Sequence, residues 1–183
     1  MLKNMNLPNK LTILRIALVP FYILFMYLSV KTPSMMYVAG LIFIIASLTD
    51  MLDGRIARAR NLVTNFGKFL DPIADKILVL TALLLFIDLG RLPMWTAIIV
   101  VAREIWIAAL RNIAVLNGRV VAADSYGKIK TMTQMVSLSI MHFEGALAFM
   151  VIPDTVIFYI SMLFTVISWV NYTVNNKDVL KED

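Results

Sequence analysis

Six long apolar segments, separated by short polar breaks, make up most of this 183-residue chain. Three stretches carry no charged residue at all: 16–30, 32–49 and 155–174. Because a membrane-spanning helix needs about 20 mostly apolar residues, the pattern predicts an all-α bundle of six transmembrane helices. We expect these helices near 9–30, 35–59, 68–89, 92–117, 125–148 and 153–174. Turn residues predict the breaks at Lys31-Thr32-Pro33, Leu89 to Pro93, Asn117-Gly118 and Pro153-Asp154.

Composition agrees with a membrane protein. Hydrophobic residues make up 60% of the chain, against about 45–50% in a soluble domain. The length suits a single domain over 1–183. There is no cysteine, which excludes disulfides, a thiolate metal site and a cysteine nucleophile.

The distribution of positive charge orients the predicted bundle. An even number of spans places both termini on one side of the membrane. In that arrangement only Lys31 and Arg91, of the 17 Lys and Arg residues, lie at the far side. Positive residues concentrate on the cytoplasmic side. We therefore expect a multi-pass protein of the cell membrane, with both termini in the cytoplasm.

Four aspartates form two pairs at helical spacing, Asp50 with Asp53 and Asp71 with Asp75. Residues three or four apart share one face of a helix. Carboxylates in or beside membrane helices are costly, so they indicate a functional site, and here it would face the cytoplasm. The alternative is that Asp50 and Asp53 only cap or hydrate a helix end.

Four carboxylates in one site repel each other and need compensating charge. Oxygen ligands suit Mg²⁺, Mn²⁺ or Ca²⁺. We do not expect zinc, because the single histidine, His142, should lie near the opposite membrane face. Two bound cations would form a clamp suited to phosphoryl chemistry.

The register of these residues resembles a known signature. Asp50, Asp53-Gly54, Ala57-Arg58, Gly67, Asp71 and Asp75 match the pattern of the CDP-alcohol phosphatidyltransferase family at every fixed position. Residues 6–15 resemble the N-terminal segment of that family, and residues 61–68 and 127–131 resemble its bacterial phosphatidylglycerophosphate synthases in particular. The resemblance covers most of the chain up to Gln134.

The resemblance implies a six-helix membrane enzyme, usually a homodimer, that transfers a phosphatidyl group from CDP-diacylglycerol to sn-glycerol 3-phosphate and releases CMP. Asp71 and Asp75 would be catalytic, with Asp75 as the base that takes the proton from the attacking hydroxyl. Two Mg²⁺ or Mn²⁺ ions would be held by Asp50, Asp53, Asp71 and Asp75. The CDP-lipid would lie near Gly54, Arg58, Thr64 and Gly67.

An acidic acceptor also needs basic residues. Arg103 and Arg111 lie eight residues apart, on roughly one helix face, and arginine suits bidentate phosphate binding. Lys128 and Lys130 open the fifth segment, and their spacing of two points them apart. We predict that all four bind the acceptor. Alternatively, Arg103 pairs with a carboxylate such as Asp71, and Lys128 is a positive-inside anchor.

Three other functions are compatible with parts of the pattern. The same chemistry with inositol phosphate, serine or phosphatidylglycerol as acceptor would leave the aspartate signature unchanged. A cation-coupled transporter also uses intramembrane carboxylates, but usually near the midplane, whereas these lie toward one face. A structural membrane protein would give no reason for the register of glycine and aspartate.

Overall fold

The structure is a computed structural model that describes residues 5–59, 64–119, 124–146 and 151–180, without the side chains of 50–59, 65, 66, 68, 151 and 180. Most of the described residues are helical, and none of them forms a strand. This confirms the predicted all-α class and its six helices. The elements are α1 (Leu7–Ser29), α2 (Ser34–Ala59), α3 (Asn65–Asp88), α4 (Met94–Leu116), α5 (Ser125–Met141), α6 (Val151–Asn175) and a short 3-10 helix, η3 (Lys177–Leu180).

The first and third helices begin at polar caps. The Asn6 side chain accepts the Asn9 backbone N–H at 3.1 Å at the start of α1, and Thr64 accepts the Gly67 N–H at 3.0 Å at the start of α3. Such caps satisfy backbone donors that the helix itself leaves unpaired. The cap starts α3 three residues before the predicted position. Pro72 lies inside the helix.

Helix α5 ends at Met141, seven residues before the predicted end. The next residue, His142, places its ring nitrogen Nδ1 2.7 Å from the Leu138 carbonyl. The break expected at Pro153-Asp154 is also wrong, because α6 already begins at Val151. Proline is tolerated in the first turn of a helix, where its missing N–H has no helical partner to lose.

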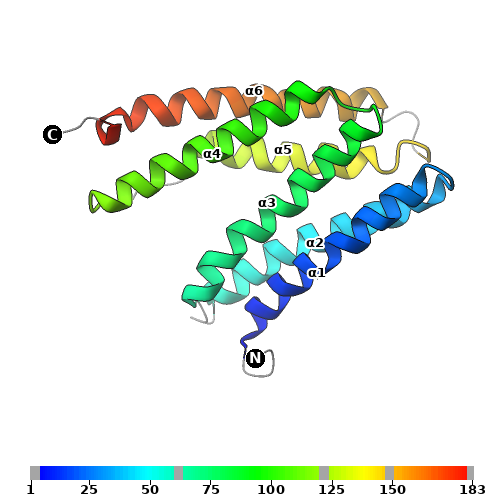
Figure 1. The fold of residues 1–183 in the computed structure, drawn as a ribbon, viewed down its shortest axis with the longest axis horizontal. Coiled ribbons are helices and arrows are strands. Elements are labelled where there is room, and N and C mark those ends of the chain that lie inside the picture. Colours follow the sequence, from blue (N-terminus) through cyan, green and yellow to red (C-terminus); the bar gives the residue numbers. More distant parts are fainter. Residues whose placement is uncertain (1–4, 60–63, 120–123, 147–150, 181–183) are drawn as a thin grey trace.

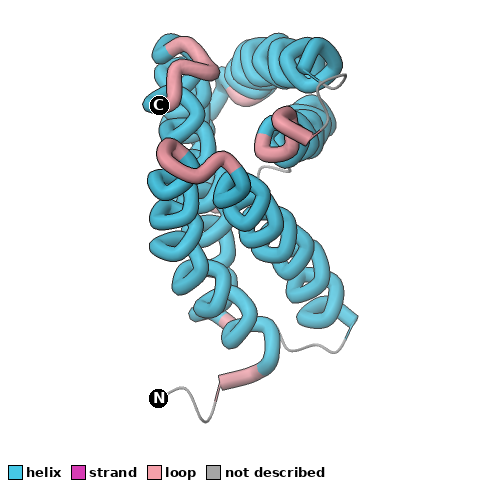
Figure 2. Tube along the Cα trace, turned by 90° about the vertical axis from the view of Figure 1, so that its right-hand side faces the viewer, coloured by secondary structure: helices cyan, strands magenta, loops and turns pink. Residues whose placement is uncertain are grey.

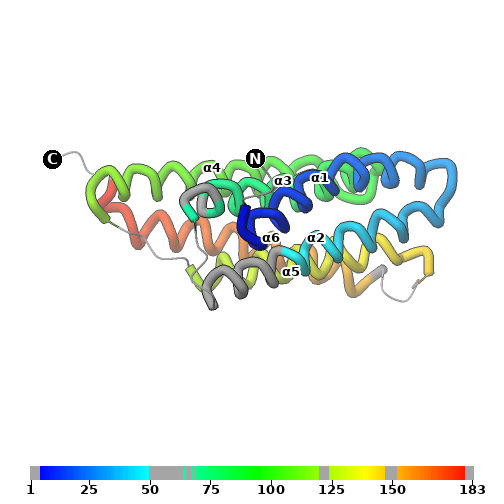
Figure 3. The backbone as a smooth tube through the Cα atoms, turned by 90° about the horizontal axis from the view of Figure 1, so that it is seen from below, coloured from blue at the N-terminus to red at the C-terminus, as the bar shows by residue number. Residues whose placement is uncertain are grey.

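The helices form two layers (Figure 3): α1, α3 and α4 lie in one, and α2, α5 and α6 in the other. Within this arrangement α1 packs against both α2 and α3, while α6 packs against α4 and α5 (Figures 1 and 2). One apolar core joins both layers. Its fully buried side chains include Tyr22, Phe43, Phe86, Leu138 and Phe158.

His142 belongs to this core. Its Nε2 lies 3.0 Å from the Tyr22 hydroxyl, and the Phe86 ring meets it edge-on at 4.8 Å between centroids. The side chain is fully buried within the bundle, and its position near the opposite membrane face stays a prediction.

The outer surface is rich in large apolar side chains. On α1 alone, Leu14, Phe21, Leu24 and Leu28 are exposed. By length and composition, two of the described helices are apolar enough to cross a membrane, Leu7–Ser29 and Ile152–Asn175. Extensive exposed apolar area on a bundle whose helices satisfy their own backbone is consistent with a membrane protein.

Candidate functional site

Buried polar side chains of α1 contact the start of α3. The Thr12 hydroxyl, which is fully buried, donates to Asp71 Oδ1 at 2.7 Å. One turn earlier, Asn9 Nδ2 donates to Thr64 Oγ1 at 3.0 Å. These bonds join two helices that are more than fifty residues apart in sequence. They hold the Asp71 carboxylate in one orientation, because a hydrogen bond to a charged group is among the stronger ones.

Gly67 allows this approach. A Cβ at this position would lie 2.7 Å from Asn9 Oδ1 and 3.2 Å from Thr64 Oγ1. Any larger residue would therefore force the Asn9 side chain to move and disturb its bond to Thr64. Thr64 and Gly67, both predicted near the CDP-lipid, form the corner at which the two helices meet.

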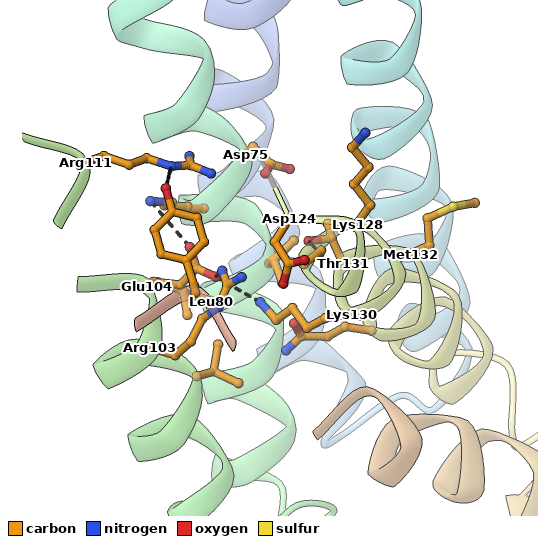
Figure 4. Close-up of a pocket in the computed structure, with 16 residues that line it drawn as sticks. Asp75, Leu80, Arg103, Glu104, Arg111, Asp124, Lys128, Lys130, Thr131 and Met132 are labelled. Atoms are coloured by element: carbon orange, nitrogen blue, oxygen red, sulfur yellow. Dashed lines mark hydrogen bonds and ion pairs between the residues drawn. The ribbon is translucent and has the colours of Figure 1, made fainter. Parts of the chain in front are cut away.

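A cavity of about 520 Å³ lies beside Asp75, one turn along α3 from Asp71 (Figure 4). Helices α3, α4, α5 and α6 all contribute to its wall. Its volume falls in the range of small-molecule sites, about 300–1,000 Å³. The lining residues are Asp75, Lys76, Val79, Leu80, Val100, Arg103, Glu104, Arg111, Asp124, Gly127, Lys128, Lys130, Thr131, Met132, Gln134 and Tyr172.

Glu104 holds the basic side chains of the wall together. Its Oε1 lies 2.7 Å from Arg103 Nη1 and 3.1 Å from Lys130 Nζ, and its Oε2 lies 3.4 Å from Lys76 Nζ. The three cations come from three different helices. Burying Arg103 and Lys130 would be costly without this carboxylate. Glu104 thus allows positive charge to be placed at the cavity wall.

Arg103 has a second contact on α6, where its Nη2 donates to Ser168 Oγ at 2.7 Å. Gly127 on α5 leaves room for the guanidinium, because a Cβ there would lie 2.8 Å from Nη2. The Arg103 Nε is buried and has no hydrogen-bond partner among the described residues. The predicted pairing of Arg103 with Asp71 is not what the structure has, because Glu104 is its carboxylate partner.

Two of the other predicted basic residues, Arg111 and Lys128, lie nearer the surface. Arg111 is exposed, and its Nε donates to the Tyr172 hydroxyl at 2.9 Å. Lys128 is exposed as well, whereas Lys130 is buried. Figure 4 shows Lys130 directed toward Glu104 and Lys128 extending in another direction. The expectation that the two lysines point apart is therefore confirmed.

The structure thus brings most of the predicted residues that it describes to one cavity. Asp75 lines it together with the four basic residues predicted from the sequence, Arg103, Arg111, Lys128 and Lys130. The side chains of Asp50, Asp53, Gly54 and Arg58 lie outside the described residues.

The chemistry of the described donors fits a hard divalent cation. Asp71 and Asp75 are one turn apart on α3 and offer oxygen ligands only. Over the described side chains, no group of three or more His, Cys, Asp or Glu residues is placed to hold a metal ion. The other two predicted ligands, Asp50 and Asp53, fall outside that search.

Sequence reasoning missed several residues of the site. Glu104 was not among the predicted site residues, although the flexible side chain of its neighbour Arg103 reaches back to it. Tyr172 gave no signal, because a lone hydroxyl in an apolar segment is usually structural. Thr12 lies in the segment 6–15 that resembles the family, but the resemblance assigned it no role. For Gln134 the sequence does carry a signal. Lys130, Gln134 and Ser137 are spaced four and three residues apart, as on one face of a helix, and that face of α5 is buried.

Comparison with known proteins bears on the whole chain. The family model for CDP-alcohol phosphatidyltransferase matches residues 5–169. A Bacillus subtilis (strain 168) protein named CDP-diacylglycerol–glycerol-3-phosphate 3-phosphatidyltransferase is 40% identical, over 96% of this chain and 97% of its own. Proteins of the same name from Haemophilus influenzae (38% identical, 91% of each chain) and Rickettsia bellii (37% identical, 91% of this chain and 93% of its own) are also similar. The chain therefore belongs to the CDP-alcohol phosphatidyltransferase family, as its aspartate signature predicted.

Proposed function

We propose that this protein transfers the phosphatidyl group of CDP-diacylglycerol to sn-glycerol 3-phosphate, giving phosphatidylglycerophosphate and CMP. One observation carries the proposal: the cavity beside Asp75 is lined by Arg103, Arg111, Lys128 and Lys130. A carboxylate that can accept a proton thus adjoins a basic pocket for a phosphorylated alcohol. The names of the similar proteins agree with this acceptor.

The charge of the cavity supports an anionic acceptor. Five cationic side chains line it, against three carboxylates, so it retains positive charge after internal pairing. A cleft of one sign within low-dielectric walls concentrates ligands of the opposite sign. The buried Nε of Arg103, which has no partner among the described residues, is a donor left over for a ligand. Serine, which carries no phosphate, would use this charge poorly.

In the proposed reaction the terminal hydroxyl oxygen of glycerol 3-phosphate bonds to the phosphatidyl phosphorus. The bond from that phosphorus to the CMP oxygen breaks, and CMP leaves. Asp75 takes the proton of the attacking hydroxyl. Asp71, which accepts the Thr12 hydroxyl, lies one turn earlier on the same helix. Arginine and lysine hold the acceptor phosphate so that its far hydroxyl is directed toward Asp75.

The remaining binding roles are carried by the junction of α2 and α3. The cytidine diphosphate would lie near Gly54, Arg58, Thr64 and Gly67. Two divalent ions, Mg²⁺ or Mn²⁺, would be held by Asp50, Asp53, Asp71 and Asp75, and when bound they would offset the charge of the diphosphate. The chemistry of the described donors, carboxylate oxygens alone, supports such ions.

We further propose that all six helices span the cell membrane as a homodimer, with both termini and the site facing the cytoplasm. The exposed apolar side chains support burial in lipid. The far-side connections supply just two basic residues, Lys31 and Arg91. A site at the cytoplasmic surface lets the lipid substrate stay embedded while glycerol 3-phosphate and CMP exchange with water.

The deciding experiment uses the purified full chain in detergent with CDP-diacylglycerol, Mn²⁺ and labelled glycerol 3-phosphate. We expect CMP release together with a labelled lipid, and little of either with inositol phosphate or serine. CMP release with another acceptor alone would replace the acceptor but keep the chemistry. No CMP release with any acceptor would overturn the proposal, and cation uptake into vesicles would then favour a transporter.

A further inference from the structure

Gln134 has an unusual environment for a polar side chain. It is 1% exposed, and neither its Nε2 nor its Oε1 has a hydrogen-bond partner within the described part of the chain. A buried polar group that is left unsatisfied destabilises the fold. Most buried polar groups are satisfied, so an unpaired carboxamide at the wall of a cavity calls for a partner from inside that cavity.

The register of three helices shows how deep Gln134 lies. Val79 follows Asp75 by one turn on α3, Val100 precedes Arg103 by one turn on α4, and Gln134 follows Lys130 by one turn on α5. All six line the cavity. The charged members form one level of the wall. The next level lies one helical turn farther from the start of α3 and comprises Val79, Val100 and Gln134.

We propose, building on the function above, that Gln134 determines acceptor specificity by binding the middle hydroxyl of glycerol 3-phosphate. A carboxamide both donates and accepts, and so does a hydroxyl, which makes the two complementary. The two valines offer no alternative partner at this depth. With the phosphate held by the cations and the terminal hydroxyl directed toward Asp75, the carbon between them lies against the deeper level.

Other polar groups of the wall are less suited to this role. The Thr131 hydroxyl already donates to the Gly127 carbonyl at 3.0 Å. Asp124 carries a negative charge, which would repel the phosphate of the acceptor. Gln134 is neutral and buried, so its carboxamide can hydrogen-bond a hydroxyl group without adding charge to the cavity. A site built to bond a hydroxyl rejects the analogue that lacks it, because its own polar group is then left unpaired.

The test compares two acceptors, sn-glycerol 3-phosphate and 3-hydroxypropyl phosphate. The second keeps the phosphate and the attacking hydroxyl but lacks the middle hydroxyl. In the unaltered protein we expect kcat/KM to favour glycerol 3-phosphate about 10- to 100-fold, the range that one hydrogen bond to a buried group supplies. In Gln134→Met, which keeps the volume and removes the amide, this ratio should fall to near parity while the KM for CDP-diacylglycerol stays within twofold.

Thr131→Val is the matched control on the same helix. Its hydroxyl is already paired, so the variant should alter both acceptors alike and leave their ratio unchanged. The melting temperature of Gln134→Met should not fall below that of the unaltered protein, because no bond within the described chain is lost.

Three results would overturn the inference. The first is an unaltered protein that uses both acceptors equally well, a measurement that needs no variant. The second is a folded Gln134→Met that keeps the original ratio. The third is a large drop in melting temperature with the ratio unchanged, which marks Gln134 as structural. All three are distinct from failure of the proposed function, in which no acceptor releases CMP.

Discussion

The Thr12 hydroxyl donates to Asp71 Oδ1 at 2.7 Å, and through this bond α1 orients a carboxylate that belongs to α3. The same hydroxyl lies 3.1 Å from the Pro8 carbonyl of its own helix. Thr12 is fully buried, so water does not replace the bond if it is lost. The orientation of Asp71 therefore depends on a residue outside the aspartate signature.

Replacing Thr12 tests this dependence. Thr12→Val keeps the shape and removes the hydroxyl, and we expect kcat to fall about 10-fold or more, since bonds to charged groups contribute about 1.5–3 kcal/mol. Thr12→Ser should restore most of the activity. Thr133→Val removes a hydroxyl that bonds backbone carbonyls of its own helix, and it should leave kcat unchanged. A fully active Thr12→Val would show that Asp71 needs no such support.

The role of Asp75 as the base predicts a large loss in Asp75→Asn. General-base catalysis contributes about 10²- to 10⁴-fold, so kcat should fall by that factor or more, and Asp71→Asn should likewise abolish turnover. Circular dichroism in detergent should show an intact helical fold. Asp88→Asn, an exposed aspartate at the other end of the same helix, should keep full activity. Near-normal turnover of Asp75→Asn would remove Asp75 from the reaction.

Glu104 is expected to act through the cations that it holds. In Glu104→Gln, Arg103 and Lys130 lose their compensating charge, which should destabilise the fold by up to about 3–5 kcal/mol and raise the KM for glycerol 3-phosphate several-fold. Steady-state kinetics should show a smaller change in the KM for CDP-diacylglycerol. Glu144→Gln breaks the ion pair with Arg91 at the opposite end. It should lower the melting temperature without altering either KM, and equal kinetic effects of the two variants would contradict the assignment.

Gly67→Ala tests the contact between α1 and α3. The added methyl group would lie 2.7 Å from Asn9 Oδ1, and overpacking of this kind costs about 1–3 kcal/mol. Thermal unfolding measures the loss. A double-mutant cycle with Asn9→Ala separates the causes, because the cost of Gly67→Ala should shrink once the Asn9 side chain is absent. Strictly additive effects would show that the collision with Asn9 is not the source.

The absence of cysteine allows the proposed topology to be tested with single introduced thiols. Thr32 lies between α1 and α2, and Asn117 follows α4; both are exposed. With a membrane-impermeant maleimide on intact cells, Thr32→Cys should be labelled and Asn117→Cys should be protected until the cells are opened. Labelling of both from outside, or of Asn117→Cys alone, would contradict the orientation.

Apolar segments predicted the six helices well, because burial in lipid or core needs long runs of hydrophobic residues. Their ends were less predictable where a single side chain decides them. Thr64 moves the start of α3 earlier by capping Gly67, a local bond that hydropathy does not record. Helix α5 ends at Met141, although apolar residues continue beyond it in the sequence.

The candidate site was also predicted only in part. Spacing predicted that Arg103 and Arg111 would lie on one face, and the cavity contains both. The partners of these arginines were not predictable, because Ser168 and Tyr172 reach them from α6, more than sixty residues away in sequence. Contacts of that kind depend on which helices become neighbours in the fold. One sequence taken alone does not reveal this.

The cavity is walled by α3 and α4 from one layer and by α5 and α6 from the other. A compound that fills the cavity therefore contacts helices of both layers and should stabilise the protein against thermal unfolding. At a concentration of 100 times its dissociation constant, such a compound adds about 2.7 kcal/mol to the free energy of unfolding. Inhibitors of this protein should thus be detectable as a rise in melting temperature, in a screen that needs neither the lipid substrate nor a turnover assay.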